Sequence, residues 1–204
     1  MTCCFCKVTQ WLLFSPLTIS IRFLLKSNSL HTIICNTYRS GRWIGIIIIE
    51  TVILCIAFFL ICFWGTGTDN KNLKSYSSYP DEVQNRIKSI AEYQGKFKES
   101  NKVVTFISNF LLFLFVLFIL GLFIKENGFT HNFLCLSIIG QGLNIFDLFI
   151  VDLLWWRNTK RVRLRKMPEK ELYQNPKKHI EAFIRAFIMY LLIALIDGYI
   201  LTLL

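Results

Sequence analysis

Acidic side chains interrupt three of the long apolar segments of this chain. Glu50 lies in the first segment, Asp147 and Asp152 lie in the third, and Asp197 lies in the last. A carboxylate in hydrocarbon is unfavourable unless it is protonated, paired with a cation or hydrated. These residue types therefore predict a site that holds a proton or a cation inside a membrane.

Six polar residues form the predicted intramembrane polar cluster: Glu50, Asn109, Gln141, Asn144, Asp147 and Asp197. With a helical rise of about 1.5 Å per residue, Glu50, Gln141 and Asp197 lie about 4–6 Å on one side of the midplane. Asn109 and Asp147 lie about 5–7 Å on the other side. At about 100° per residue, Gln141, Asn144 and Asp147 share one broad polar face with Asp152.

Glu50 and Asp197 form the sharpest hypothesis within this cluster. Two carboxylates at one depth in a low dielectric cannot both ionise cheaply, so we expect them to share a proton or a cation. The alternative is a structural role in which a protonated acid is hydrogen bonded.

Residues nearer the membrane surface suggest structural roles. Asp152 and Arg185 match in depth at about 12–13 Å from the midplane, which predicts an ion pair that fixes helix packing. His179 follows two lysines at a helix start and is interpreted as an interfacial residue rather than a ligand. Trp155 and Trp156 are interpreted as interfacial anchors.

Composition indicates which elements must position these residues. The chain of 204 residues is 54% hydrophobic and 18% charged, with a mean hydropathy of +0.49. That is too apolar for a soluble domain and predicts an all-α, polytopic membrane protein. Apolar runs of sufficient length predict a bundle of four transmembrane helices at about 43–64, 103–124, 132–156 and 181–204.

The first loop contains a further helix signal. Pro80 followed by Asp81 and Glu82 marks a helix start, and Val83 and Ile87 begin a short apolar stripe. We expect a short amphipathic helix that rests on the bundle or on headgroups. The alternative is a gate or docking element.

Residues 1–42 differ from the rest and are predicted to be an N-terminal extension outside the transmembrane domain, 43–204. A translated leader is the alternative interpretation. Cys3, Cys4 and Cys6 have no second Cys or His group at zinc spacing, so no metal site is predicted.

Positive charge is concentrated in two loops and sets the expected orientation. By the positive-inside rule, loops 65–102 and 157–180 face the cytoplasm of a cell-membrane protein. The basic stretch at 157–178 adjoins a span, so we expect it to bind anionic headgroups of the bilayer and not nucleic acid. The sequence leaves a membrane-protein partner and a homo-oligomer both open.

Known catalytic signatures are missing from the membrane part. It contains no HExxH, GxSxG or Walker A pattern, which favours a protein that is not an enzyme, and the sequence leaves the cofactor unknown.

From about residue 43 onward, the chain resembles a family of small multi-pass bacterial membrane proteins that are often loosely labelled ABC transporter permeases. The features that carry the resemblance are listed here: Glu50, Tyr79-Pro80 with Val83-Gln84, Asn144, Asp147, Asp152, Trp155, the KRVR stretch at 160–163, and His179. The family usually continues KRVR with an apolar residue and a Pro-Gly-Thr turn, whereas this chain has Leu164, Arg165, Lys166 and Met167 before Pro168. The resemblance implies a permease-like membrane protein without a known mechanism.

Three functions follow as hypotheses. A transporter or transport subunit for a cation or a proton-coupled solute would use the polar cluster near the midplane. A membrane-embedded enzyme acting on lipid headgroups would use Asp147, Asp152 and His179 near the cytoplasmic interface, with or without a divalent metal. A scaffold subunit without catalysis would use the polar residues for helix packing alone. Depth separates the first two hypotheses, and the sequence favours transport.

Overall fold

The computed structural model describes residues 28–97, 99 and 101–204, and the side chains among them from residue 43 onward. The chain divides into two units, Met1–Gly45 and Ile46–Leu204, and all packing described below lies within the second unit. The predicted extension at 1–42 lies largely outside the described residues. From Asn28 its backbone is already part of helix α2, Asn28–Trp64.

The described residues are mostly helical and contain no strand beyond one isolated bridge between Leu164 and Met167. Within them, four helical segments are long and apolar enough to cross a membrane: Trp43–Trp64, Lys102–Ile124, Phe129–Trp156 and Glu171–Leu203. The predicted all-α bundle of four transmembrane helices is confirmed, and the protein is an integral membrane protein.

The spanning elements after α2 are α5, Lys102–Ile124, and then α6, Phe129–Phe146. Helix α6 continues without a break into the π-helix η4, Asp147–Trp156. The last spanning helix is α7, Lys177–Leu203, which begins four residues before the predicted start at 181.

Helices α6 and α7 form the closest pair of the bundle. A side chain at Gly140 of α6 would meet the ring of Tyr190 at 3.0 Å, and one at Gly198 of α7 would meet the backbone of Phe133 at 3.1 Å. Small residues at these two crossings therefore let the helices approach closely, as is common between transmembrane helices.

Helix α5 packs against the bundle along its second half. Leu117, Gly121 and Ile124 are buried, whereas every residue from Lys102 to Asn109 is exposed. The first half of α5 is therefore not covered by the other helices.

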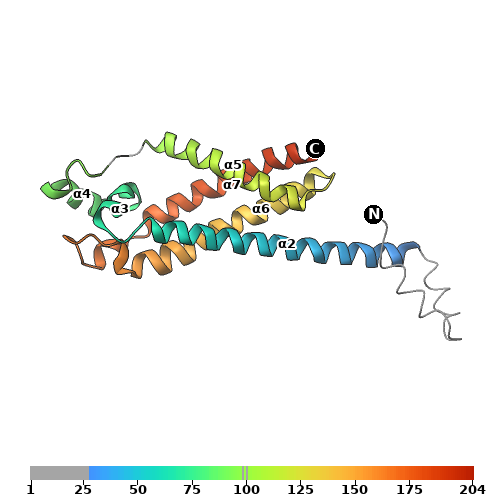
Figure 1. Cartoon of the computed structure of the whole chain (residues 1–204), viewed down its shortest axis with the longest axis horizontal. Coiled ribbons are helices and arrows are strands. Elements are labelled where there is room, and N and C mark those ends of the chain that lie inside the picture. The colour runs from blue at the N-terminus through green and yellow to red at the C-terminus, as the bar shows by residue number, and fades with distance from the viewer. Residues whose placement is uncertain (1–27, 98, 100) are drawn as a thin grey trace, which may run out of the picture. The chain divides into compact units, whose positions relative to one another are not determined.

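Two loops fold together at one end of the bundle (Figure 1). The first loop contributes α3, Asp69–Lys74, η2, Tyr76–Ser78, α4, Asp81–Ser89, and η3, Ala91–Tyr93. The loop before α7 contributes η5, Lys160–Val162, and η6, Glu171–Tyr173. We call these two segments, 65–97 and 157–176, the cap.

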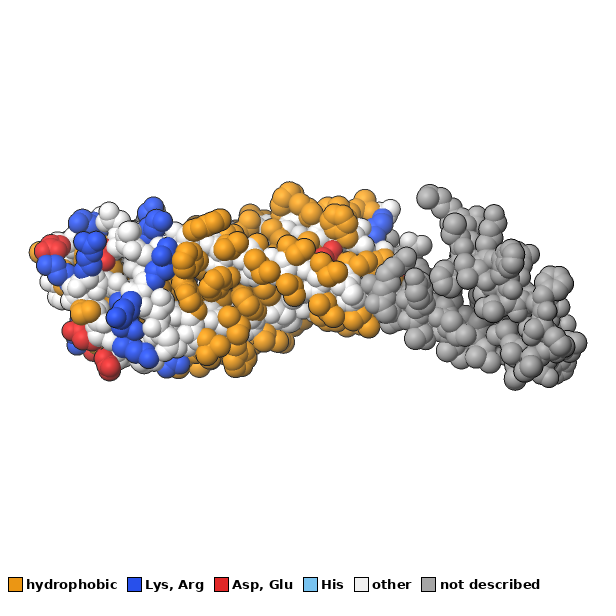
Figure 2. Space-filling model, turned by 60° about the horizontal axis from the view of Figure 1, so that its bottom comes forward, with side chains coloured by type: hydrophobic (Ala, Val, Ile, Leu, Met, Phe, Trp, Pro, Cys, Tyr) orange, Lys and Arg blue, Asp and Glu red, His pale blue; other side chains and the backbone are white. Residues whose placement is uncertain are grey.

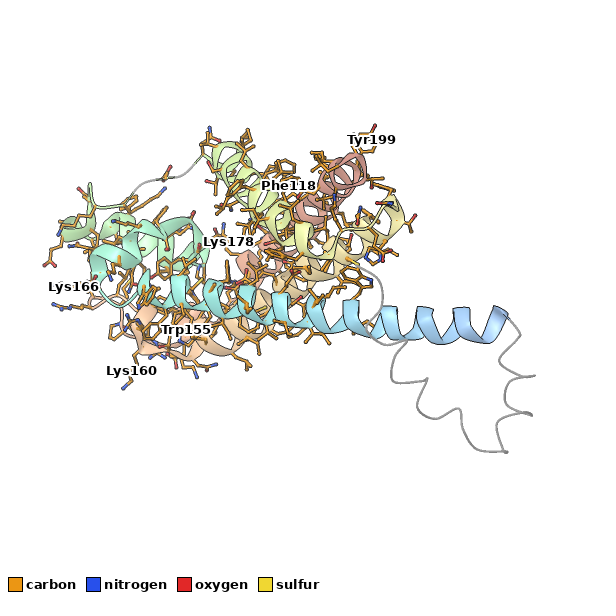
Figure 3. All side chains as sticks on the ribbon, turned by 45° about the vertical axis from the view of Figure 1, so that its right-hand side comes forward. Phe118, Trp155, Lys160, Lys166, Lys178 and Tyr199 are labelled. Atoms are coloured by element: carbon orange, nitrogen blue, oxygen red, sulfur yellow. The ribbon has the colours of Figure 1, made fainter. Side chains whose placement is uncertain are left out.

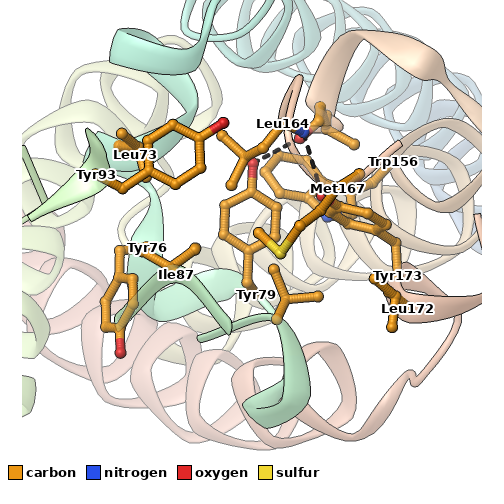
Figure 4. Packing of buried hydrophobic residues seen from close by; sticks show 12 residues of the cluster. Leu73, Tyr76, Tyr79, Ile87, Tyr93, Trp156, Leu164, Met167, Leu172 and Tyr173 are labelled. Carbon is orange, nitrogen blue, oxygen red and sulfur yellow. Dashed lines mark hydrogen bonds between the residues drawn. The ribbon is translucent and has the colours of Figure 1, made fainter. Parts of the chain in front are cut away.

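The cap has its own hydrophobic core, shown in Figure 4, to which both loops and Trp156 contribute. Helix α4 is the predicted amphipathic helix, and its apolar residues Val83 and Ile87 are fully buried in this core. The apolar stripe of α4 therefore packs into the core of the cap, whereas the sequence had led us to expect that it rests on the bundle or on headgroups.

Hydrogen bonds join the two loops of the cap across a long stretch of sequence. The hydroxyl of Tyr79 donates to the carbonyl of Val162 at 2.6 Å, and the amide of Asn72 donates to the carbonyl of Arg161 at 3.0 Å. Buried side-chain donors that reach backbone carbonyls hold irregular segments in one conformation.

Charged and apolar side chains separate over the surface of the second unit. Lys, Arg, Asp and Glu gather mostly over the cap, whereas hydrophobic side chains cover the bundle (Figure 2). This is the distribution of a protein whose bundle faces lipid and whose cap faces water.

Candidate functional site

A cavity of about 580 Å³ lies under the cap, and we call it the cap-side cavity. Its walls come from α2, α5, η4, α7 and the serines at 75, 77 and 78 of the cap. Lys178, labelled in Figure 3, lies in this region between the cap and the first half of α5.

The π-helix η4 presents both of its acids to this cavity, because Asp147 and Asp152 are among the residues that line it. In a π-helix, backbone hydrogen bonds join residues five apart, so residues i and i+5 lie close to the same face. In an α-helix the same two residues would point about 140° apart. Segments of π-helix are rare and are often found at functional sites.

Asp152 pairs with His179 in the first turn of α7. The distance between Asp152 Oδ2 and His179 Nδ1 is 2.9 Å, and the two side chains are 16% and 6% exposed. A carboxylate on one ring nitrogen fixes the tautomer of a histidine and orients its ring. The other nitrogen, Nε2, then carries the lone pair.

His179 Nε2 is buried and has no hydrogen-bond partner within the described residues, and the same is true of Trp156 Nε1. The two rings meet edge to face with their centroids 6.2 Å apart, and both residues line the cap-side cavity. One nitrogen is an acceptor and the other is a donor. A hydroxyl group or a water molecule could therefore donate a hydrogen bond to His179 Nε2 and accept one from Trp156 Nε1.

Cations surround the same cavity. Lys102, Lys178 and Arg185 line it, and Lys178 also pairs with Asp81 of the cap at 2.7 Å. The hydrogen bond from Lys178 lowers the pKa of Asp81 below its ordinary value.

The predicted ion pair between Asp152 and Arg185 is not formed in the structure, where the partner of Asp152 is His179. Two features of the helices explain this correction. Helix α7 begins at Lys177, which brings His179 into the helix at the level of Asp152, and η4 changes the helical phase that the prediction assumed. Arg185 lines the same cavity but forms no ion pair among the described residues.

Two of the three expected interfacial residues lie inside the protein. His179 is 5% exposed and Trp156 is 8% exposed, so both are covered by protein. The ring of Trp156 packs on that of Tyr79, whereas Trp155 packs on Phe59 of α2.

The predicted polar cluster divides into separate groups. Asn109 and Asp147 line the cap-side cavity. Gln141 and Asn144 instead bind backbone carbonyls of α7: Gln141 Nε2 donates to the carbonyl of Phe187 at 3.0 Å, and Asn144 Nδ2 donates to that of Phe183 at 3.3 Å. These two amides therefore hold α6 against α7.

Glu50 and Asp197 are both buried, with 8% and 1% exposure, as their predicted place inside the bundle requires. One oxygen of each, Oε2 of Glu50 and Oδ2 of Asp197, has no hydrogen-bond partner in the described part of the chain. No contact between the two carboxyl groups is seen there, so their coupling stays a prediction.

The sequence did not indicate the contact between Trp156 and His179 or the π-helix that carries Asp147 and Asp152. The two acids were predicted to share one broad polar face, and their spacing of five residues, which fits the turn of a π-helix, was the one available signal for that helix. Within residues 28–97, 99 and 101–204, no group of three or more His, Cys, Asp or Glu residues has the arrangement of a metal site.

Comparisons with known proteins found no matching family model, no similar curated protein and no similar solved structure. The resemblance to permease-labelled bacterial proteins therefore stays a prediction.

Proposed function

We propose that this protein is a membrane-embedded enzyme that acts on a lipid headgroup in the cap-side cavity, with His179 as the general base. The observation that carries the proposal is the 2.9 Å pair between Asp152 and His179, whose second ring nitrogen lacks a partner beside a cavity. A histidine oriented in this way by a carboxylate is a common arrangement for proton transfer.

Depth supports a reaction at the interface. Asp152 lies one π-turn before the end of η4, and His179 is the third residue of α7, so the pair lies where the spanning helices meet the cap. The sequence had favoured transport on the expectation of a midplane cluster. The geometry instead favours the second hypothesis, because the polar side chains that share a cavity lie toward one surface.

The chemistry that fits this arrangement is hydrolysis of a headgroup ester. His179 Nε2 takes a proton from a water molecule, and the water oxygen bonds to the phosphorus or carbonyl carbon of the ester. The bond to the leaving oxygen breaks, and that oxygen takes the proton back from the imidazolium. Asp152 stabilises the imidazolium charge in between.

The test is headgroup release from lipids of defined composition around the purified protein in nanodiscs, followed by mass spectrometry. We expect H179Q to lower product formation about 100-fold or more, the usual contribution of a general base. D152N should lower it less, because the base remains present.

H131Q is the matched control. His131 also lies near a carboxylate, with its Nδ1 3.8 Å from Glu126 Oε2, but it belongs to the start of α6 and does not line the cavity. No headgroup release by the native protein, or equal release by H179Q, would reject the proposal.

Proton-coupled transport is a second candidate, supported by the buried acids Glu50 and Asp197. Each has a carboxyl oxygen without a hydrogen-bond partner among the described residues. Because unpaired carboxyl oxygens are costly in hydrocarbon, two of them in one bundle support a functional role. In proteoliposomes, E50Q should abolish proton uptake while the fold is retained, because an amide cannot exchange a proton in this way. Unchanged proton uptake in E50Q, or none in the native protein, would contradict this role.

A further inference from the structure

Arg185 carries a positive charge inside the membrane-spanning part of α7. It is the ninth residue of the helix, about 12 Å along the axis from Lys177. Its side chain is exposed, lines the cap-side cavity and has no ion pair or hydrogen bond in the described part of the protein. An unpaired guanidinium at such a depth is unfavourable, so this position calls for an anion or for water.

Part of the cavity wall is apolar, and the wall is incompletely closed. Phe58 and Ile61 of α2 and Phe106 and Phe113 of α5 line the cavity together with polar residues of α5, and the residues of α5 from Lys102 to Asn109 are exposed. A cavity that combines cations with aromatic and aliphatic side chains matches a molecule with a charged head and an acyl chain.

We propose that the cap-side cavity binds a phospholipid of the adjoining leaflet, with its phosphate at Arg185 and its acyl chains along the apolar wall between α2 and α5. This inference rests on the proposed function, since it names the class of lipid that His179 acts on. A guanidinium binds phosphate through two parallel hydrogen bonds, which makes arginine well suited to this role.

The cavity holds charges of both signs: the acids Asp147, Asp152 and Glu181 line it together with the cations. Lys102 and Lys178 add positive charge at the rim, next to the cap. Asp152 is already paired with His179. Asp147 lies one π-turn before Asp152 in η4, farther from the cap.

Binding is measured by native mass spectrometry on delipidated protein, with phosphatidylglycerol as the probe. R185Q should weaken binding of phosphatidylglycerol about tenfold, which corresponds to ~1.4 kcal/mol. R86Q is the control, because Arg86 is an exposed arginine of α4 that pairs with Glu82 at 3.3 Å, away from the cavity. It should leave binding unchanged.

Competitors identify which part of the lipid is recognised. Diacylglycerol with the same acyl chains lacks the phosphate, and inorganic phosphate or glycerol 3-phosphate lacks the chains, so all three should compete poorly. Equal competition by diacylglycerol, equal competition by the free phosphates, or unchanged binding in R185Q would each overturn the inference.

H179Q separates this inference from the proposed function. It should bind phosphatidylglycerol like the native protein and yet release no headgroup. Tight phosphate-dependent binding without any headgroup release would support the lipid site and reject the enzyme. Headgroup release that depends on His179 but not on Arg185 would support the enzyme and reject the lipid site at Arg185.

Discussion

The pair between Asp152 and His179 makes a quantitative prediction for a double-mutant cycle. The variants D152N and H179Q, alone and together, remove the charge and the ring while keeping approximate size. The two side chains meet at 2.9 Å and are mostly buried, and a hydrogen bond to a charged group contributes about 1.5–3 kcal/mol. We therefore expect a coupling energy of about 1.5–3 kcal/mol. The stability losses of the two single variants should then sum to more than the loss of the double variant.

The assay is unfolding in mixed micelles at increasing SDS, followed by tryptophan fluorescence. Trp156 packs on the ring of His179 and reports directly on this region. A second cycle, of D152N with R185Q, is the control and should be additive within about 0.5 kcal/mol. Additivity in the first cycle, or strong coupling in the second, would refute the pairing and restore the pair expected from the sequence.

Four further predictions concern the cap, the bundle and the topology. Y79F should lower the free energy of unfolding by about 1–3 kcal/mol in the same SDS assay, because it leaves the buried carbonyl on the second loop of the cap without its donor. Burial and a hydrogen bond to a carboxylate raise the pKa of Tyr93 to about 12, so its contribution to stability is complete below pH 10 and is lost as the pH rises from 10 to 12. Y93F should flatten this part of the stability profile. A valine at Gly140 should cost about 1–3 kcal/mol by overpacking, whereas a valine at Gly128, where the nearest space is open, should cost little. If the cap is cytoplasmic, as the loop cations suggest, a cysteine at Ser77 should react with an impermeant reagent in intact cells only after permeabilisation.

The spanning helices could be predicted from the sequence because each is a continuous apolar run of sufficient length. The helix start at Asp81 could also be predicted, since Pro80 and two acids form a local signal. The surface against which that helix packs could not be predicted. Val83 and Ile87 are buried against residues of a loop that lies more than 70 positions later in the chain, and an apolar stripe does not identify the surface that covers it.

The site was predicted in part. The residue types were found, since Asp147, Asp152 and His179 are polar groups in or beside apolar runs. Their pairing was not, because depth was calculated for α-helices with fixed ends. A four-residue shift of the start of α7 and the π-helix η4 changed both depth and phase, and the calculation allowed for neither.

The long-range bonds of the cap impose an order on biogenesis. Tyr79 and Val162 are 83 positions apart, and α5, α6 and η4 are synthesised between them. During translation, the tyrosines and Leu73 of the first loop therefore lack their partners while two membrane spans, Lys102–Ile124 and Phe129–Trp156, are inserted. Closure of such a distant contact is intrinsically slow. A nascent chain that stops before residue 157 exposes this apolar surface to chaperones and proteases. The surface is buried only after the second loop of the cap has been synthesised.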